Sequence, residues 1–291
     1  MSASLPVDYP AVASVFSTVV MSALAHSSTG NIRNRLNLLA HLPQNKDPDT
    51  TLGQAFDNAY NLLVADYRNE YVFKNILMTN LLDVSKGMSA VLEQHMGDSR
   101  ADLMILDDTS TVYEVKTDLD QFVRLPAQLT NYCYHAEFVY VVVSEKRAVN
   151  ALTHIPAHVG LMAVQNDGSL RVVRQAISNM GDIKHDQLFR LLRGKEVHQL
   201  IKDMPNFVSH TNMLHKWQQS GKLFSQLSLA EAQAGVVEQF RTRGAKAQHL
   251  ITSDQFPQSL WALAYSREYS KKGMELILTR LNQPVSSFVT R

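Results

Sequence analysis

The hydrophobic and polar positions of this chain repeat with two different periods, and each period predicts a different kind of element. Apolar residues recur every three or four positions at 12–24, which predicts one helix, and at 55–82, which predicts one long helix or two. An apolar run at 101–106 and a run rich in β-branched and aromatic residues at 112–116 predict strands. Residues 107–110, Asp-Asp-Thr-Ser, are turn formers, so we expect the two strands to form a hairpin.

The pattern that follows predicts a sheet with helices around it. Residues 91–96 are expected to form the first strand or to lead into it, and the continuous apolar run FVYVVV at 138–143 fits a strand buried on both faces. Runs at 159–164 and 170–174 predict a second hairpin around Asn166-Asp167-Gly168. The order helix, hairpin, helix, strand, hairpin predicts an α/β fold, with a mixed β-sheet core flanked by helices.

Helical spacing also extends to both sides of this sheet-forming stretch. In the C-terminal part, 187–204 carries a helical pattern, and Ser228 with Glu231 predicts the capping box of a helix that ends near Gly244. The expected divisions are a helical N-terminal extension at 1–60, a core at 61–180 and a helical C-terminal region at 181–291.

Composition narrows the class of protein. The chain has 291 residues, 45% of them hydrophobic, which suits a globular protein, and its net charge of +1 means that any basic surface must be local. The single cysteine, Cys133, excludes an internal disulfide and a cysteine-rich zinc site and favours a reducing cytoplasm. The apolar run at 11–25 follows Asp8 and has no Lys or Arg before it, whereas a secretory signal normally has a basic start. The run is also too short to span a bilayer. We therefore expect a buried helix there and a soluble chain without membrane contact.

The predicted hairpin at 101–116 concentrates the candidate chemistry. Side chains alternate between the faces of a strand, so Glu114 and Lys116 project from the same side. If the loop is centred on Asp108, Asp102 lies opposite Glu114, with Cβ atoms about 5 Å apart. Two carboxylates at that separation repel unless a cation lies between them, and Mg²⁺ is commonly held by one or two carboxylates with water and substrate phosphate. Lys116 would then orient a water or offset charge that develops on phosphate.

An aspartate, a turn and then Glu-x-Lys form the core motif of this hairpin. With Asp102 and Glu114-Val115-Lys116 in these places, the chain resembles the PD-(D/E)XK nuclease superfamily. Ala101 stands where the family often has proline. That proline is not a metal ligand, so the difference leaves the proposed ligands unchanged.

A second match lies on the helix expected after the hairpin. Pro126 suits its first turn, and Gln128 and Tyr132 are four residues apart and therefore share one face. The subset of the superfamily that resembles RecB nucleases carries Lys-Thr after the second strand and then Gln-x-x-x-Tyr on the following helix. Lys116-Thr117 and Gln128-Leu-Thr-Asn-Tyr132 match both.

This resemblance implies a restriction-endonuclease-like core over roughly residues 62–178 and a metal-dependent nuclease or endonuclease, acting on DNA more often than RNA. It also links the chain to DNA processing or mobile-element conflict in bacteria and phages. The Mg²⁺ or Mn²⁺ ligands that it implies are Asp102, Glu114, the backbone carbonyl of Val115 and a helical glutamate, here Glu70. The catalytic and supporting residues that it implies are Asp102, Glu114, Lys116, Gln128 and Tyr132.

Other interpretations of the same residues stay open. Glu70 can instead be an exposed helix glutamate that pairs with Lys74 at the i+4 position. The core can be a nucleic-acid- or protein-binding regulator on a nuclease scaffold, without catalysis. The Glu-x-Lys match can also be accidental, in an interaction protein where Asp102 and Glu114 lie out of metal-bridging reach. The helical flanks can bind a protein partner or a second copy of the chain.

Basic residues exceed acidic ones between Lys184 and Lys246. A basic helical face beside a metal site would hold a phosphate backbone, whereas for any single residue a solvated charged face is the alternative. Trp217 and Trp261 are expected in the core rather than as platforms on which bases stack.

Overall fold

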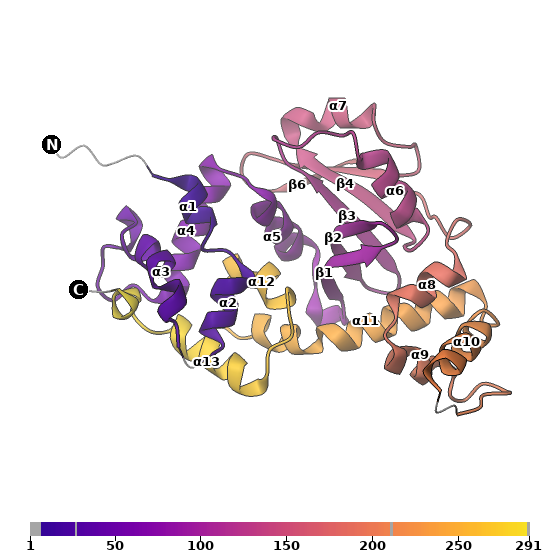
Figure 1. Cartoon of the computed structure of the whole chain (residues 1–291). Helices are drawn as coiled ribbons and strands as arrows, with labels where there is room; N and C mark the ends of the chain where they lie inside the picture. Colours follow the sequence, from indigo (N-terminus) through magenta and orange to yellow (C-terminus); the bar gives the residue numbers. More distant parts are fainter. Residues whose placement is uncertain (1–6, 27, 210–211, 290–291) are drawn as a thin grey trace. The chain divides into compact units, whose positions relative to one another are not determined.

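The computed structural model describes residues 7–26, 28–209 and 212–289, which form a mixed α/β fold (Figure 1). The strands are β1 (Ser89–Met96), β2 (Ser99–Leu106), β3 (Ser110–Lys116), β4 (Phe138–Ser144), β5 (Gly160–Val164) and β6 (Leu170–Arg174). The helices are α1 (Tyr9–Ala13), α2 (Thr18–Leu24), α3 (Arg33–Ala40), α4 (Leu52–Asp66), α5 (Glu70–Leu81), α6 (Leu125–Cys133), α7 (Ala148–Leu152), α8 (His185–Leu191), α9 (Gly194–Ile201), α10 (Met213–Phe224), α11 (Leu229–Ile251), α12 (Trp261–Tyr265) and α13 (Lys271–Leu281). Short 3₁₀ helices lie at Gly30–Ile32, Pro43–Asn45, Val84–Lys86, Glu145–Arg147, Gln258–Leu260 and Val285–Phe288.

The six strands form one mixed sheet in the order β1-β2-β3-β4-β5-β6. The pairs β1–β2 and β2–β3 are antiparallel, whereas β3–β4 is parallel. A parallel pair needs a crossover connection, and α6 supplies it, packing against β2 and β4. Val141, Val142 and Val143 of β4 are all buried, as expected for a strand covered on both faces. The predicted α/β class, the mixed sheet and its flanking helices are therefore confirmed.

The chain packs into two compact units, each assembled from segments far apart in sequence. The helical unit comprises Met1–Leu81, Val164–Leu170 and Ala245–Arg291, and the sheet unit comprises Leu82–Ala163 and Arg171–Gly244. The helices after β6 are thereby divided. Helices α8 to α10 belong with the sheet, and α12 and α13 belong with the N-terminal helices. The division at 1–60, 61–180 and 181–291 stays a prediction.

The single helix predicted at 12–24 is wrong, because the structure has two helices there, α1 and α2. The hydroxyl of Ser14 donates to the carbonyl of Ala11 at 2.6 Å, and Ser17 has extended backbone with φ −139° and ψ 153°. Serine hydroxyls that bond nearby carbonyls compete with the continuation of a helix. Apolar positions on both sides of the break are buried, so their spacing alone suggested one element.

Two other helical patterns also divide. The pattern at 55–82 forms α4 and α5, one of the two expected forms, and the single pattern at 187–204 forms α8 and α9 because Leu192 and Arg193 are extended. The capping box at the start of α11 is confirmed. That helix continues past Gly244 to Ile251, because one glycine inside a helix costs only about 1 kcal/mol. None of the helices among the described residues is long and apolar enough to cross a membrane.

The packing of β5 against β4 gives a test of the sheet. A Cβ atom added to Gly160 would lie 2.3 Å from the ring of Tyr140 and 2.9 Å from the backbone nitrogen of Ala176. Replacing Gly160 with alanine must therefore displace a buried ring, and we expect the free energy of unfolding to fall by about 1–3 kcal/mol. The measurement is urea denaturation, with Gly181→Ala as the control because no atom lies within 4 Å of its added Cβ. Equal stability of the two variants would contradict this packing.

Candidate active site

The register of the central hairpin places two of the predicted site residues opposite each other. In the β2–β3 pair, Leu103 faces Tyr113 and Met104 faces Val112, so the next pair outward is Asp102 and Glu114. Directly opposed residues in an antiparallel pair project from the same face of the sheet. The hairpin is therefore centred on the turn that the sequence predicted.

Glu114 is the centre of a hydrogen-bonded network between β3 and α6. Its carboxylate is buried, with only 2% of the residue exposed. Oε1 accepts from Lys116 Nζ at 2.5 Å and from Gln128 Nε2 at 2.6 Å, and Oε2 accepts from the Tyr132 hydroxyl at 2.7 Å. Lys116 Nζ also donates to Gln128 Oε1 at 3.0 Å. Four of the predicted residues thus meet at one point.

The Tyr132 side chain is fully buried beneath this network. Its hydroxyl lies 2.7 Å from Glu114 Oε2 and 2.9 Å from the backbone carbonyl of Arg100, so it can donate its proton to one or the other. Burial, followed by the negative charge of Glu114, raises the pKa of Tyr132 well above its usual value. The phenol therefore stays protonated and acts as a donor that holds the carboxylate in place.

Asp102 links the same two strands through the backbone. Its Oδ2 atom accepts from the Val115 N–H at 2.7 Å, so the half-buried carboxylate is directed at the strand that carries Glu114. Val115 itself is buried. The metal-binding role of its carbonyl stays a prediction, because the contact found here is made by its amide.

Glu93, which the sequence reasoning missed, extends the group of acids to a third strand. Leu92 pairs with Leu103 and Gln94 with Ala101, so Glu93 falls across from Asp102. Carboxylate oxygens of Glu93 and Asp102 lie within 4.8 Å of each other. We call Glu93, Asp102 and Glu114 the acidic row. Counting residue pairs outward from the two-residue turn between β1 and β2 would have placed Glu93 opposite Asp102.

The backbone and partners of Glu93 are unusual for a strand residue. Its φ of 55° lies in the left-handed region, where a glutamate is uncommon. Its Oε2 atom pairs with Arg100 Nε at 2.7 Å. With Lys116 beside Glu114, the acidic row therefore has a cationic side chain at each end.

Glu70 lies at the N-terminus of α5, in the helical unit. Its Oε1 atom pairs with Lys74 Nζ at 2.5 Å, and the lysine side chain is only 6% exposed. The i+4 ion pair, which was the alternative interpretation of Glu70, is therefore present. A role for Glu70 as a metal ligand stays a prediction.

The donor chemistry of the acidic row suits a hard divalent cation. Mg²⁺ and Mn²⁺ prefer carboxylate, carbonyl and water oxygens, and the row offers three carboxylates from neighbouring strands. A cation there would reduce the repulsion among these groups. Glu93 and Asp102, whose carboxylate oxygens lie within 4.8 Å of each other, therefore have the donor chemistry that the predicted metal prefers.

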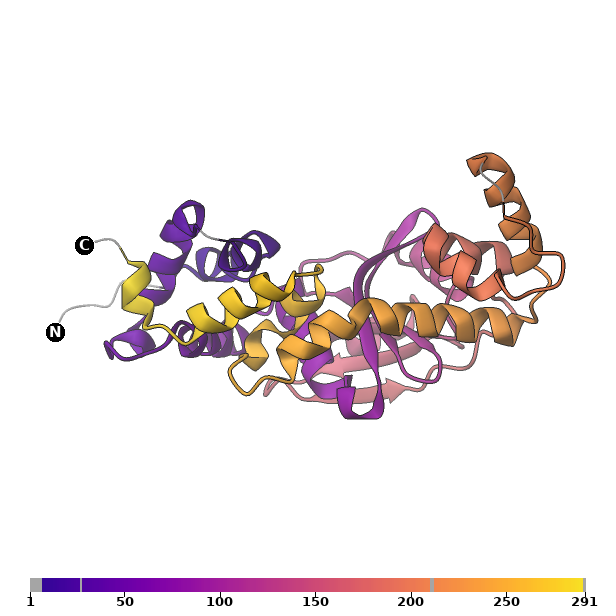
Figure 2. The same cartoon turned by 90° about the horizontal axis from the view of Figure 1, so that it is seen from below.

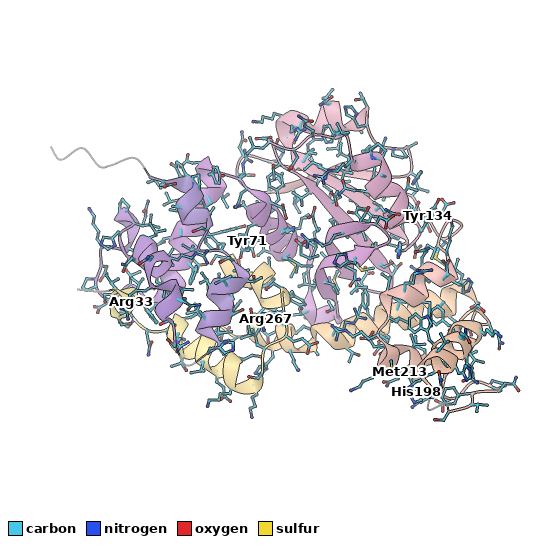
Figure 3. The ribbon with its side chains drawn as sticks, in the orientation of Figure 1. Arg33, Tyr71, Tyr134, His198, Met213 and Arg267 are labelled. Carbon is cyan, nitrogen blue, oxygen red and sulfur yellow. The ribbon has the colours of Figure 1, made fainter. Side chains whose placement is uncertain are left out.

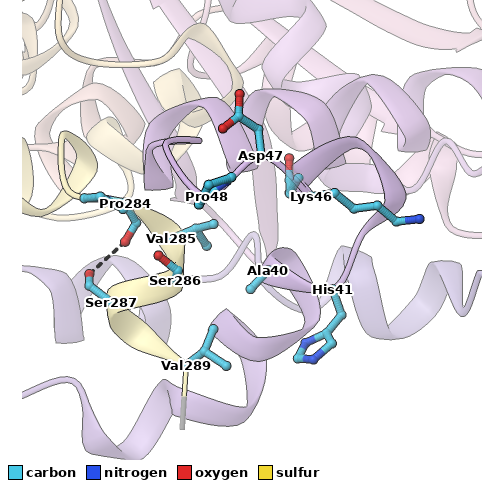
Figure 4. A pocket seen from close by; sticks show the side chains of 11 residues that line it. Ala40, His41, Lys46, Asp47, Pro48, Pro284, Val285, Ser286, Ser287 and Val289 are labelled. Atoms are coloured by element: carbon cyan, nitrogen blue, oxygen red, sulfur yellow. Dashed lines mark hydrogen bonds between the residues drawn. The ribbon is translucent and has the colours of Figure 1, made fainter. Parts of the chain in front are cut away.

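A separate hollow of about 620 Å³ lies in the helical unit (Figure 4). Its lining includes His41, Lys46 and Asp47, and Ser287 donates to the carbonyl of Pro284 at 2.7 Å in its wall. Asp47 is the one carboxylate among the lining residues. This hollow therefore offers a single carboxylate rather than a group of acids.

Comparisons with known proteins identify a family for this chain. The family model described as bacteriophage P4 protein cII matches residues 64–260, which is more than half of the chain. A solved structure of SPO1766, a protein of unknown function from Silicibacter pomeroyi, is 21% identical, covers 39% of this chain and 75% of its own, and has a TM-score of 0.32. No curated protein matches the chain.

The hydroxyl of Tyr132 provides a test of the network. Tyr132→Phe keeps the buried ring but removes a donor to a buried carboxylate, so we expect the free energy of unfolding to fall by about 1–3 kcal/mol. Half-buried Tyr134, two residues further along, gives the matched control Tyr134→Phe. Chemical denaturation of both variants makes the comparison. An equal loss in both would show that the Glu114 contact contributes nothing specific.

Proposed function

We propose that this chain, which belongs to the bacteriophage P4 protein cII family, is a metal-dependent nuclease with its active site at the acidic row. One observation carries the proposal. The buried Glu114 carboxylate accepts hydrogen bonds from Lys116, Gln128 and Tyr132. Glu114 itself lies opposite Asp102 in the β2–β3 register. Carboxylates beside a fixed ammonium group are what phosphodiester hydrolysis with a divalent ion requires.

Each residue of the site has a chemical task in this proposal. The metal, Mg²⁺ or Mn²⁺, would be held by Asp102, Glu114 and the carbonyl of Val115, and Glu70 would be a further ligand. Glu93 lies beside Asp102 and adds a carboxylate there. When bound, the metal supplies an acidified water and a positive charge for the phosphate.

The other roles in this proposal belong to Lys116, Gln128 and Tyr132. The ammonium group of Lys116 would orient the attacking water or stabilise the negative charge that develops on the phosphate in the transition state. Gln128 contacts both Lys116 and Glu114 and so fixes their separation, while Tyr132 holds the other carboxylate oxygen.

The substrate in this proposal is a nucleic acid. The motif resemblance favours DNA over RNA, and a role in DNA processing or mobile-element conflict in a bacterium or phage. The single cysteine favours a cytoplasmic location.

The decisive experiment measures cleavage of single- and double-stranded DNA with Mg²⁺, Mn²⁺ or EDTA. We expect cleavage that needs the metal and that falls by about 10²–10³-fold in Lys116→Ala, because the variant loses the charge that stabilises the phosphate. The matched control is Lys86→Ala, which removes an exposed lysine paired with Asp83 in the same unit. Circular dichroism shows whether both variants are folded. A full rate in folded Lys116→Ala would refute the assigned role.

A second candidate is a nucleic-acid- or protein-binding regulator that uses the same scaffold without catalysis. The observation in its favour is that Glu114 already accepts three hydrogen bonds, which occupy most of the lone pairs of a carboxylate. Such a network would hold α6 on the hairpin without an ion. This candidate predicts binding without turnover, unchanged by Asp102→Asn.

A further inference from the structure

The first two turns of α10 expose large apolar side chains. The residue exposures are 85% for Met213, 62% for Leu214 and 47% for Trp217, and Val208 just before the helix is 54% exposed. We call these four residues the α10 patch. In Figure 2 the helix projects from the other helices of the sheet unit, and Figure 3 labels its first residue, Met213. Met213, Leu214 and Trp217 lie at helix positions i, i+1 and i+4 and so share one side of α10, and exposed apolar groups that gather in this way mark binding surfaces.

Trp217 occupies a fixed place within this patch. Its ring centroid lies 4.4 Å from that of the mostly buried Phe189, at an interplanar angle of 52°. The expectation that Trp217 belongs to the core is therefore wrong, because Phe189 supports the indole while about half of the residue stays exposed. In the second half of α10, Ser220, Leu223 and Phe224 are buried and anchor the helix. A supported, accessible indole is suited to stacking with another flat ring.

Positive charge is concentrated around the patch. The segment 184–222 contains seven Lys and Arg against three Asp and Glu, a net charge of +4 in a chain whose total is +1, so the other residues together carry −3. All seven basic residues are exposed. Of the three acids, Glu196 is paired with Arg243 through two guanidinium nitrogens. The surface presented by α8 to α10 is therefore complementary to a polyanion.

We propose that α10 binds single-stranded nucleic acid, with an unpaired base stacked on Trp217 and backbone phosphates at the lysines around it. Met213, Lys216 and Trp217 lie at helix positions i, i+3 and i+4, so an ammonium group and an indole flank the same exposed side chain. Aromatic platforms in a basic surface are the general means by which proteins bind single strands. The inference rests on the proposed function, and it names the substrate class of that nuclease.

Two other occupants fit the observations less well. A second copy of the chain would bring two surfaces of the same positive charge together, which opposes association. A membrane surface would need a longer apolar face, because the exposed large apolar side chains of α10 are confined to its first two turns. Stacking also requires an unpaired base, so a single strand fits better than a duplex.

The test uses the full chain with Trp261→Phe, so that Trp217 is the one tryptophan, and EDTA to prevent cleavage. A thymidine-only oligonucleotide is expected to quench the Trp217 fluorescence and to bind more tightly than a duplex of the same length. In the parent chain, with binding followed by anisotropy of a labelled oligonucleotide, Trp217→Ala should weaken binding about ten-fold. Lys216→Gln should reduce the slope of log affinity against log salt by about 0.7. Val149→Ala, which shortens an 81% exposed apolar side chain on α7, should change neither value.

Four results would overturn the inference: unchanged affinity in folded Trp217→Ala, equal or tighter binding of the duplex, a dimer in sedimentation that Trp217→Ala dissociates, or binding to anionic vesicles without binding to the oligonucleotide. Because EDTA separates binding from cleavage, the two proposals fail independently. Trp217-dependent binding without any metal-dependent cleavage would leave this inference standing and remove the nuclease. Cleavage with binding that is indifferent to Trp217 would do the reverse.

Discussion

A buried carboxylate at the end of β3 is the constraint on which the candidate site depends. Removing an ionised group from water costs several kcal/mol unless hydrogen bonds and an opposite charge compensate it. Glu114 receives that compensation from the ammonium of Lys116 on its own strand and from two donors on α6. The crossover helix must therefore lie over the hairpin in one register. The same helix makes the parallel β3–β4 pair possible, so the site and the sheet topology share one element.

Charge is separated within the sheet unit even though the whole chain is nearly neutral. The acidic row crosses three adjacent strands, and each end is held by a cation, Arg100 or Lys116. The positive surface of α8 to α10 comes from a different part of the sequence. In the proposed function, the basic surface would attract a polyanion and the acidic row would hold a cation, and phosphodiester hydrolysis uses both. Membership of the bacteriophage P4 protein cII family is compatible with this arrangement, and the functional argument rests on the site itself.

The left-handed backbone of Glu93 fits the same picture. A non-glycine residue at φ 55° is energetically unfavourable and persists only where its surroundings hold it. Here the pairing of the neighbouring residues with β2 and the contact with Arg100 provide that support. The Glu93 carboxylate is thereby held next to Asp102, as the third member of the acidic row.

The sequence by itself determined those features that depend on near neighbours. The turn residues at 107–110 set the hairpin register and so placed Asp102 against Glu114, and helical geometry put Gln128 and Tyr132 on one face. Tertiary structure alone decided the sharing of the C-terminal helices between two units. It also decided that Trp217 is exposed, because burial depends on which distant segment arrives to cover a side chain. Periodicity records which face of an element is apolar, but it contains no information about the partner that the face will meet.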